Sequence, residues 1–418
     1  MKKLVCLLLS MVLILCVFSG CSGSNSSTLK VGYAYFDITP PSNVNVTLGG
    51  DLVDTRTIEV NYDRLPGMCL ALTGGKDNTF LIYSLDLLYT TDTLMGYIPS
   101  ISEATGIPQD RILINAAHCH HAPHPDTTAH PGNAEYMTLL QRWMIDAGQA
   151  AIDDQKEAQM HTASVELEKM NTVRHYLMLD GSVAGEGFGN FNIPIVSAVT
   201  ESDKEMQMIK FTRTGGEDIL LMNWQGHPKS TGTSIETRSA TISGLERMRV
   251  QLKEEHNTLL AFFIGASGNV NNQSRIAAQQ RFYNYEDHYQ YLAQQAVSQQ
   301  FKQVNAGTLQ FKSSTIEAAG KSSDKISVTI YGLSLGDVAF VFAPYEMFNS
   351  SGLAIKKDSP YETTFVSTCS MGNFGYIPDE ATYAYDSYEV KGSRFAKGAC
   401  ETLTEGFISI LKDLKSGN

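Results

Sequence analysis

The sequence lacks any cluster of lysine and arginine. Its 32 basic residues are outnumbered by 44 acidic residues, which gives a formal net charge of −12. Because binding to nucleic acid depends on clustered positive charge, this balance argues against a nucleic-acid partner. Internal repeats and low-complexity segments are also missing beyond residue 28. With 43% hydrophobic residues among 418, the composition is typical of a globular protein and excludes a disordered or collagen-like chain.

Closely spaced cysteines are absent as well. The chain has seven cysteines and no Cys-x-x-Cys pair, which excludes a zinc knuckle or a thioredoxin-like motif. Four of them lie beyond the N-terminal region, namely Cys69, Cys119, Cys369 and Cys400. In an exported protein these residues allow one or two disulfides, whose pairing the spacing does not decide.

Long apolar runs are confined to the N-terminus. Two lysines precede an apolar run at residues 4–18, and Ser19-Gly20-Cys21 follows it. This pattern is typical of a bacterial lipoprotein signal peptide, which is cut before the cysteine that takes the lipid. We expect residues 1–20 to be removed, Cys21 to be lipidated and residues 21–28 to form a flexible tether. An ordinary secretory signal or an uncleaved anchor is the alternative.

Two consequences follow for the location of the protein. No later stretch reaches 18 apolar residues, so no further membrane span is expected. A lipid on Cys21 would place the protein outside the cytoplasm, on the bacterial cell surface or the periplasmic side, and attach it to a membrane.

Beyond the tether, apolar strands alternate with amphipathic helices. The expected strands are 31–36, 79–85, 112–116, 219–224, 259–264, 326–333 and 338–343. The expected helices are 134–151, 241–256, 285–304 and 395–415. Continuous apolar strands are typical of sheets buried between other layers. The mixture predicts an α/β protein, and we expect residues 29–418 to form a single catalytic domain because no linker divides them.

A histidine-rich segment follows the expected strand 112–116. It contains His118-Cys119-His120, and five of the ten histidines lie between residues 118 and 130. In extended backbone, residues two apart point to the same side, so we expect His118 and His120 to project together. Two imidazoles placed in this way can bind one metal ion or a metal-bound water. Cys119 is expected to point the other way, into the core. A solvated histidine-rich loop is the alternative.

Four other segments place polar side chains after apolar strands or in turns. They are Gly226-His227-Pro228, Gly265-Ala266-Ser267-Gly268-Asn269, Pro344-Tyr345-Glu346 and Gly375-Tyr376. Ser267 does not lie in a Gly-x-Ser-x-Gly motif, so it is not the nucleophile of an α/β-hydrolase elbow. Taken singly, each segment also has a structural interpretation, such as a hydrogen-bonded histidine, a strand-to-helix turn or an exposed acid.

Together these motifs resemble those of the neutral (non-lysosomal) ceramidase family. The similarity holds in order and approximate spacing over nearly all of residues 31–400. It rests on residues 33–41 (Tyr-Ala-Tyr-Phe-Asp-Ile-Thr-Pro-Pro), Gly49-Gly50, Tyr83-Ser84-Leu85-Asp86, His118-Cys119-His120, Gly226-His227-Pro228, Ala266-Ser267-Gly268-Asn269, Pro344-Tyr345-Glu346, Gly375-Tyr376 and Tyr388-Glu389. The family usually has His-Thr-His where this chain has His118-Cys119-His120.

The resemblance implies a layered αββα sandwich of mixed sheets with one catalytic zinc ion. The implied ligands are His118, His227 and Glu346, with Tyr376 as a weaker fourth. Zinc accepts neutral imidazole nitrogen and carboxylate oxygen, and a catalytic site leaves one position open for water. Bound zinc can lower the pKa of that water to about 7.

The resemblance also implies roles for four residues beside the metal. His120 would handle a proton or polarise the substrate. Ser267 would position the water or attack the substrate itself; we favour the water because no general base is evident beside the hydroxyl. Arg174 and Tyr388 would donate hydrogen bonds to the developing oxyanion. A surface charge is the alternative interpretation of Arg174.

The implied activity is zinc-dependent hydrolysis of the amide bond of an N-acylated lipid, such as N-acylsphingosine, or of a related N-acyl compound. Ceramidases proper are longer and carry a C-terminal β-sandwich domain, whereas this chain ends soon after the last motif. Neither the segment 89–97 nor the loop 188–193 indicates a sphingolipid groove, so the chemistry carries over better than the substrate. Two other functions stay open: a metallo-esterase acting on a cell-surface glycan or lipid, and a non-catalytic lipoprotein that binds a ligand.

Overall fold

The computed structural model describes residues 28–417, with gaps at residues 45, 48, 50–63, 76–77, 121, 229–243 and 323. The expected signal peptide, the lipidated Cys21 and all but the last residue of the tether lie outside the described residues. Every helix in the described ranges is too short or too polar to cross a bilayer.

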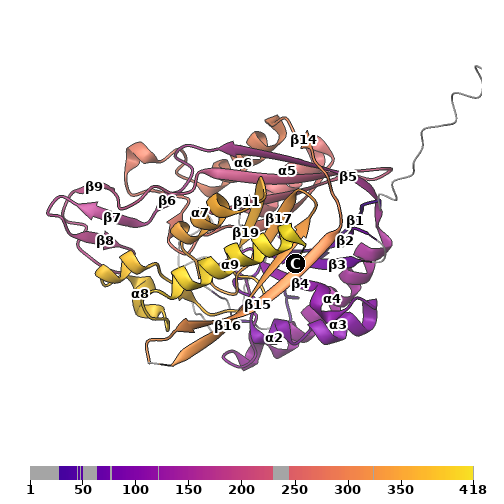
Figure 1. Ribbon diagram of the computed structural model, residues 1–418, viewed down its shortest axis with the longest axis horizontal. Coiled ribbons are helices and arrows are strands. Elements are labelled where there is room, and N and C mark those ends of the chain that lie inside the picture. Colours follow the sequence, from indigo (N-terminus) through magenta and orange to yellow (C-terminus); the bar gives the residue numbers. More distant parts are fainter. Residues whose placement is uncertain are drawn as a thin grey trace, which may run out of the picture.

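The larger of two stacked sheets has nine strands within the described residues (Figure 1). Their order is β12-β11-β10-β5-β1-β2-β3-β4, and β14 pairs with β5 beside this path. The bounds are β1 Lys30–Asp37, β2 Pro66–Thr73, β3 Thr79–Leu85, β4 Ile112–Ala116, β5 Lys156–Glu166, β10 Glu205–Arg213, β11 Asp218–Trp224, β12 Thr258–Ile264 and β14 Lys302–Gln303. The pairs β3–β4 and β11–β12 are parallel, and the other pairs are antiparallel.

The strands at the two ends of this sheet also contact each other. Strands β1 and β5, which join the two halves of the sheet, share only two residue pairs. Elsewhere, Ser84 of β3 and Asn115 of β4 both donate hydrogen bonds to the carbonyl oxygen of Phe262 in β12, at 2.6 and 3.2 Å. These contacts bring the end of β4 near the ends of β11 and β12, although many strands separate them in the sheet order.

The smaller sheet packs on one face of the larger sheet. Its strands follow the order β15-β16-β17-β19, with bounds Leu309–Ala319, Lys325–Leu335, Val338–Phe342 and Thr363–Ser367. Buried side chains from both sheets form one apolar core, in which Phe263 of β12 contacts Phe340 of β17 and Phe365 of β19. Removal of this apolar surface from water holds the two sheets together.

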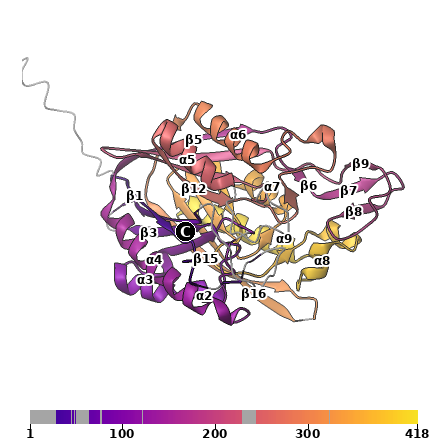
Figure 2. The ribbon, with the colours of Figure 1, turned by 180° about the vertical axis from the view of Figure 1, so that it is seen from behind.

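Helices cover the outer faces of both sheets (Figures 1 and 2). Over the larger sheet lie α3 Ile98–Thr105, α4 Ala134–Asp153, α5 Gly244–His256 and α6 Tyr285–Ser298, and over the smaller sheet lie α7 Asn349–Asp358 and α9 Ala399–Ser416. In α4, the buried residues Tyr136, Leu140, Met144 and Ala147 recur every three or four positions, so one face of the helix packs on the sheet. The four layers confirm the predicted α/β sandwich.

Short elements complete the described chain. Three small sheets pair β6 Thr172–Val173 with β13 Val270–Asn271, β18 Glu346–Met347 with β20 Tyr376–Ile377, and β7 His175–Met178 with both β8 Val183–Gly185 and β9 Ile195–Ala198. The short helices are α2 Asp92–Met95 and α8 Tyr388–Gly392, with 3-10 turns at Gln109–Arg111, Pro131–Asn133, Ala277–Gln279 and Glu380–Ala384. Strands β7, β8 and β9 form an arm that projects at one end of the molecule, beside α8 (Figure 1).

All seven predicted strands are present, each within two residues of its predicted bounds. Two predicted helices differ from the observed helices by more than two residues at one end. The helix predicted at 285–304 ends at Ser298, because the chain turns there into β14. The helix predicted at 395–415 begins only at Ala399, because Gly398 before it has a φ of +91°, which a helix cannot contain. The first three residues of the helix predicted at 241–256 lie outside the described residues.

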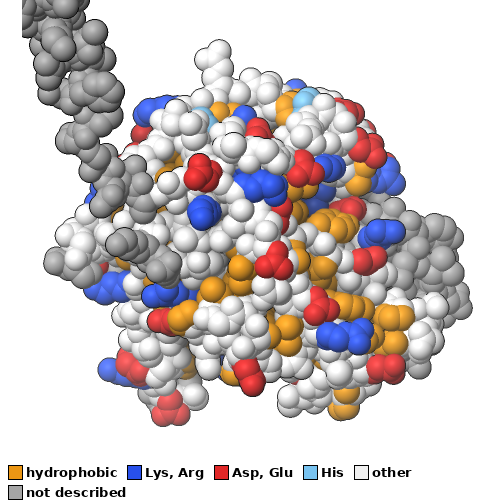
Figure 3. All heavy atoms as spheres, turned by 90° about the vertical axis from the view of Figure 1, so that its right-hand side faces the viewer, with side chains coloured by type: hydrophobic (Ala, Val, Ile, Leu, Met, Phe, Trp, Pro, Cys, Tyr) orange, Lys and Arg blue, Asp and Glu red, His pale blue; other side chains and the backbone are white. Residues whose placement is uncertain are grey.

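The four cysteines beyond the N-terminal region are all buried free thiols, so no disulfide joins them. Cys119 lies in the core between the larger sheet and its helices, as predicted. On the face shown in Figure 3, basic and acidic side chains of the described residues are interspersed, and none of them gather into a basic patch. This face gives no support to binding of nucleic acid.

Candidate metal centre and active site

The two histidines after β4 lie together, as the spacing predicts. His118 is fully buried, and its Nε2 atom lies 3.2 Å from Nε2 of His120. The backbone is not simply extended here, because His118 has a φ of +63°. Left-handed backbone is uncommon for a residue other than glycine, and it is concentrated at functional sites. The turn is held by hydrogen bonds from the Ala117 and Cys119 amides to Leu85 and Leu87, at 2.8 and 2.9 Å.

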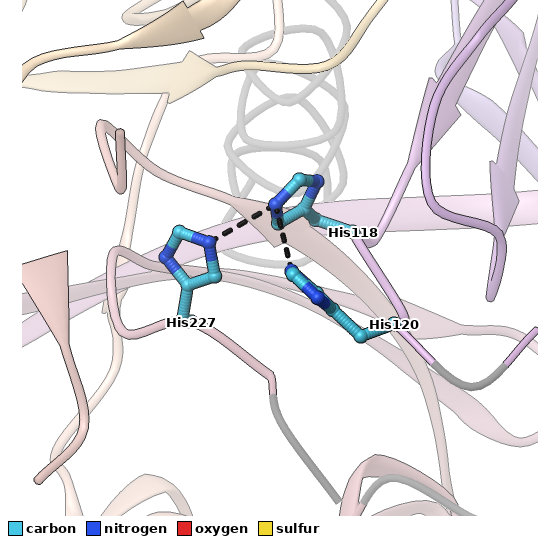
Figure 4. Close-up of side chains that lie close together, drawn as sticks. All are labelled: His118, His120 and His227. Carbon is cyan, nitrogen blue, oxygen red and sulfur yellow. Dashed lines mark hydrogen bonds between the residues drawn. The ribbon is translucent and has the colours of Figure 1, made fainter. Parts of the chain in front are cut away.

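His227 reaches the same point from the end of β11. Its Nε2 atom lies 3.0 Å from Nε2 of His118, although the two residues are 109 positions apart in the sequence (Figure 4). The turn requires the glycine before it, because a Cβ on Gly226 would fall 1.6 Å from Oδ1 of Asn272. The Nε2 atoms of His118, His120 and His227 therefore form a compact group that could hold a metal ion.

The ring orientation of two histidines is set by backbone carbonyls. Nδ1 of His118 lies 3.0 Å from the carbonyl oxygen of Leu88, and Nδ1 of His227 lies 3.0 Å from that of Val270. A carbonyl only accepts hydrogen bonds, so each Nδ1 atom carries a hydrogen and donates it. In the neutral rings both Nε2 atoms then present lone pairs toward one another, the arrangement of a pair of metal ligands.

Glu346 supplies a carboxylate to this group. It is 1% exposed, and its Oε2 atom lies 3.3 Å from Nε2 of His118 and 3.9 Å from Nε2 of His227. Its Oε1 atom accepts a hydrogen bond from the Tyr89 hydroxyl at 3.4 Å. Oε2 has no hydrogen-bond partner among the described residues. A buried carboxylate oxygen in this condition is costly unless a cation lies beside it.

Tyr376 lies next to Glu346, and Arg174 contacts Tyr376. Glu346 and Tyr376 are register partners in the parallel pair β18–β20, which places the two residues side by side. Nη2 of Arg174 donates to the Tyr376 hydroxyl at 3.4 Å and to the carbonyl oxygen of Gly268 at 2.8 Å, while Nε donates to Oε1 of Glu389 at 2.8 Å. Arg174 is only 4% exposed, so it is not a surface charge.

Ser267 and Tyr388 differ in their exposure to solvent. Ser267 is fully buried, and its Oγ atom has no hydrogen-bond partner in the described part of the chain. Its neighbour Gly268 packs on the backbone that carries Glu346 and donates its amide hydrogen to the carbonyl oxygen of Met347 at 2.8 Å. Tyr388 is 49% exposed, and its ring centroid lies 5.6 Å from that of Tyr376. Ser267 therefore lies beside the buried Glu346 strand, and Tyr388 at the solvent edge near Tyr376.

Comparison with solved structures shows which fold holds these residues. Neutral ceramidase from Pseudomonas aeruginosa aligns with a TM-score of 0.72 at 13% sequence identity, over 93% of this chain and 75% of that chain. A ceramidase complexed with C2 aligns with a TM-score of 0.71 at 13% identity, with the same two coverages. The chain has the neutral ceramidase fold. No protein-family model matches the sequence, and no curated protein matches it.

Within the ceramidase fold, charges shape the pKa values of the candidate site. Burial lowers the pKa of His118, but Cys369 and the Glu346 carboxylate raise it overall, well above 6.5. Burial and the Glu346 carboxylate raise the pKa of Tyr376, which Arg174 only partly offsets. The surroundings of His118 thus favour a positive charge at the point where the imidazoles meet.

The pKa of Glu389 provides a test of its ion pairs with Arg174 and His175. Burial would raise the pKa of Glu389, but the hydrogen bond from His175 and the charge of Arg174 hold the pKa at about 2, below the ordinary 4.5. A lowered folded-state pKa gives stability above pH 4.5 that is lost as the pH falls toward 2. The advantage of the wild type over Glu389→Gln in free energy of unfolding should therefore shrink by about 2 kcal/mol between pH 6 and pH 3.

Urea unfolding of both proteins at several pH values measures this difference. The contributions of other titrating groups are common to both proteins and cancel when the two are subtracted. An advantage that does not change with pH would show that the Glu389 carboxylate is not held ionised by its two partners.

Two residues beside the site are not among those assigned from the sequence. Tyr89 contacts Glu346, and Glu389 anchors Arg174. A signal for Tyr89 exists, because it follows β3, the parallel neighbour of the strand that ends before His118. Glu389 lies in the Tyr388-Glu389 motif, where only the tyrosine received a role. Its contact with Arg174 spans 215 positions, and no local pattern predicts it.

Proposed function

We propose that this protein is a zinc-dependent amidohydrolase that cleaves the amide bond of an N-acylated lipid or a related N-acyl compound. One observation carries the proposal: Nε2 of His118, Nε2 of His227 and Oε2 of Glu346 converge within 3.0 to 3.9 Å of one another, on a fold shared with neutral ceramidase.

The donor set fits zinc. Imidazole nitrogen and carboxylate oxygen are ligands that zinc prefers. The Nε2 atoms of two imidazoles lie 3.0 Å apart, beside a buried carboxylate oxygen without a hydrogen-bond partner among the described residues, and these atoms together could hold a cation. The Tyr376 hydroxyl would be the fourth, weaker ligand. His120 also lies within reach through Nε2, although we assign it to proton handling because it is the least buried of the three histidines.

The chain's own residues would serve an amide hydrolysis as follows. When bound, zinc supplies Lewis acidity and lowers the pKa of a coordinated water. His120 would accept or return a proton, and the buried Ser267 hydroxyl would hold the attacking water in position. Arg174 and Tyr388 would donate hydrogen bonds to the oxygen of the scissile amide as its negative charge grows. The buried position of Arg174 suits this role, since fixed donors in a dry site act most strongly.

The substrate class follows from chemistry and location together. A lipid on Cys21, as the sequence predicts, would hold the site beside a membrane and outside the cytoplasm. An N-acylated lipid in that membrane would then lie within reach of the site, and an N-acylsphingosine is the nearest candidate.

Zinc content and amide cleavage test the proposal together. The purified protein lacking the first 21 residues should hold about one zinc ion per chain. It should also release lauric acid from N-lauroyl amides. Chelation should stop the release, and zinc should restore it. A well-folded protein that binds no zinc even when zinc is supplied would contradict the proposal and favour a ligand-binding lipoprotein. Cleavage of lauroyl esters alone would indicate a metallo-esterase.

A further inference from the structure

The arm beside the candidate site carries a carboxylate at the tip of a tight turn. Gly185 and Phe188 exchange two backbone hydrogen bonds, of 3.1 and 3.3 Å, so Glu186 and Gly187 are the two residues of a hairpin loop. Gly187 has a φ of +72°, a conformation that glycine adopts without strain. The local sequence therefore specifies a turn that displays the side chain of Glu186.

Packing fixes this turn. The ring of Phe188 stacks on Tyr385 at a centroid distance of 6.0 Å and meets His175 at 5.5 Å. A Cβ on Gly185 would fall 3.1 Å from the carbonyl oxygen of Arg174, so the start of the turn lies against the backbone of that residue. The backbone that carries Glu186 is thus fixed on both sides of the turn, which a residue that selects substrates needs.

The Glu186 carboxylate is joined to the candidate site through Arg174. Nη1 of Arg174 lies 3.3 Å from Oε2 of Glu186, and Nη2 of the same guanidinium lies 3.4 Å from the Tyr376 hydroxyl. One planar group therefore bridges Glu186 and a proposed zinc ligand. The opposite edge of the guanidinium is taken by Glu389 at 2.8 Å. Arg174 has one positive charge against two carboxylates, so these three side chains together carry a net negative charge.

Exposure increases along this side of the site. His118 and Ser267 are fully buried and Arg174 is 4% exposed, whereas the Glu186 side chain is 45% exposed. Tyr388 lies beside the same turn, since a Cβ on Gly187 would be 3.9 Å from Cβ of Tyr388. A substrate that reaches the buried centre from this side passes Glu186 and Tyr388.

We propose that Glu186 is a specificity-determining residue that selects against substrates with an anionic amine fragment. The inference rests on the proposed amidohydrolase function and deepens it. The acyl chain of an N-acyl lipid is uncharged, so the Glu186 carboxylate discriminates on the other side of the amide bond. It favours neutral or cationic amine fragments, such as amino alcohols, over N-acyl amino acids, whose carboxylate it repels.

The test compares two substrates with the same acyl chain, N-lauroylethanolamine and N-lauroylglycine, on the zinc-loaded protein. Glu186→Gln keeps an oxygen that can accept a hydrogen bond from Arg174 but removes the charge. It should raise kcat/KM for N-lauroylglycine relative to N-lauroylethanolamine by about five- to tenfold, the effect of one charge at roughly 7 Å in an intermediate dielectric. Glu186→Lys should raise this ratio further.

The matched control is Glu362→Gln, which removes the same charge from a side chain that is 78% exposed and paired with Lys302. Its substrate ratio should equal that of the wild type. Zinc content and thermal unfolding of each variant verify that the centre is intact. A ratio unchanged in both Glu186 variants, with both substrates slowed by the same factor, would overturn the inference and leave Glu186 a residue that only holds Arg174.

Failure of the proposed function gives a different result. A wild-type protein that binds zinc but cleaves neither amide refutes the amidohydrolase proposal and the inference built on it. A wild type that cleaves N-lauroylethanolamine upholds the amidohydrolase proposal, whatever the Glu186 variants do to the ratio.

Discussion

Replacing Glu346 with glutamine is expected to lower zinc affinity by about 10³-fold, equivalent to roughly 4 kcal/mol, and to abolish zinc-dependent amide hydrolysis. The carboxylate is 1% exposed and lies 3.3 Å from Nε2 of His118. Glutamine has nearly the same shape, but it brings no negative charge to this buried point. Competition with a chromophoric chelator measures the affinity, and release of lauric acid from N-lauroylethanolamine measures the activity.

The control for this prediction is again Glu362→Gln, whose side chain is 78% exposed and which should keep full zinc content and activity. Thermal unfolding of the zinc-free proteins separates loss of the ligand from loss of the fold. Zinc content and turnover at the wild-type level in Glu346→Gln would exclude Glu346 as a zinc ligand.

Replacing Gly268 with alanine is expected to lower kcat/KM by about 10²-fold, because a displacement of about 1 Å in a catalytic centre has effects of this size. A Cβ here would fall 2.7 Å from the carbonyl oxygen of Glu346 and 2.9 Å from that of Met347. These are backbone atoms that no side-chain rotation can remove. We also expect a loss of about 1–3 kcal/mol in the free energy of unfolding.

Gly132→Ala is the matched control, since a Cβ at Gly132 would meet nothing within 4 Å. Urea unfolding and the rate at saturating zinc measure the two effects. An alanine at position 268 that costs stability but leaves the rate intact would show that the spacing between the Ser267 loop and Glu346 does not control the chemistry.

Much of the fold could be predicted because several strands are apolar along their whole length. Strands β3 and β4 have the predicted bounds, 79–85 and 112–116, since each is a short, mainly apolar segment between turns. Strands β5 and β15 were not predicted. Their residues are largely polar and partly exposed, and it is pairing with β10 and β16 that makes them strands.

In the candidate site, too, some contacts could be predicted from the sequence and others could not. The spacing of His118 and His120 predicts that they lie together, and the structure brings their Nε2 atoms to 3.2 Å. The contact between the Glu346 and Tyr376 strands depends on a two-residue pairing of β18 with β20. Strands this short carry no periodicity from which a partner could be inferred.

The sequence by itself determined which chemical groups stand at the ends of buried strands, because apolar runs and the turns that follow them are local patterns. Only the tertiary structure decided that the ends of β4 and β11 meet, that Arg174 is buried between Glu186 and Glu389, and that Tyr89 contacts Glu346. These relations arise from packing between segments far apart in the chain, where burial and charge are set by neighbours that no local pattern identifies.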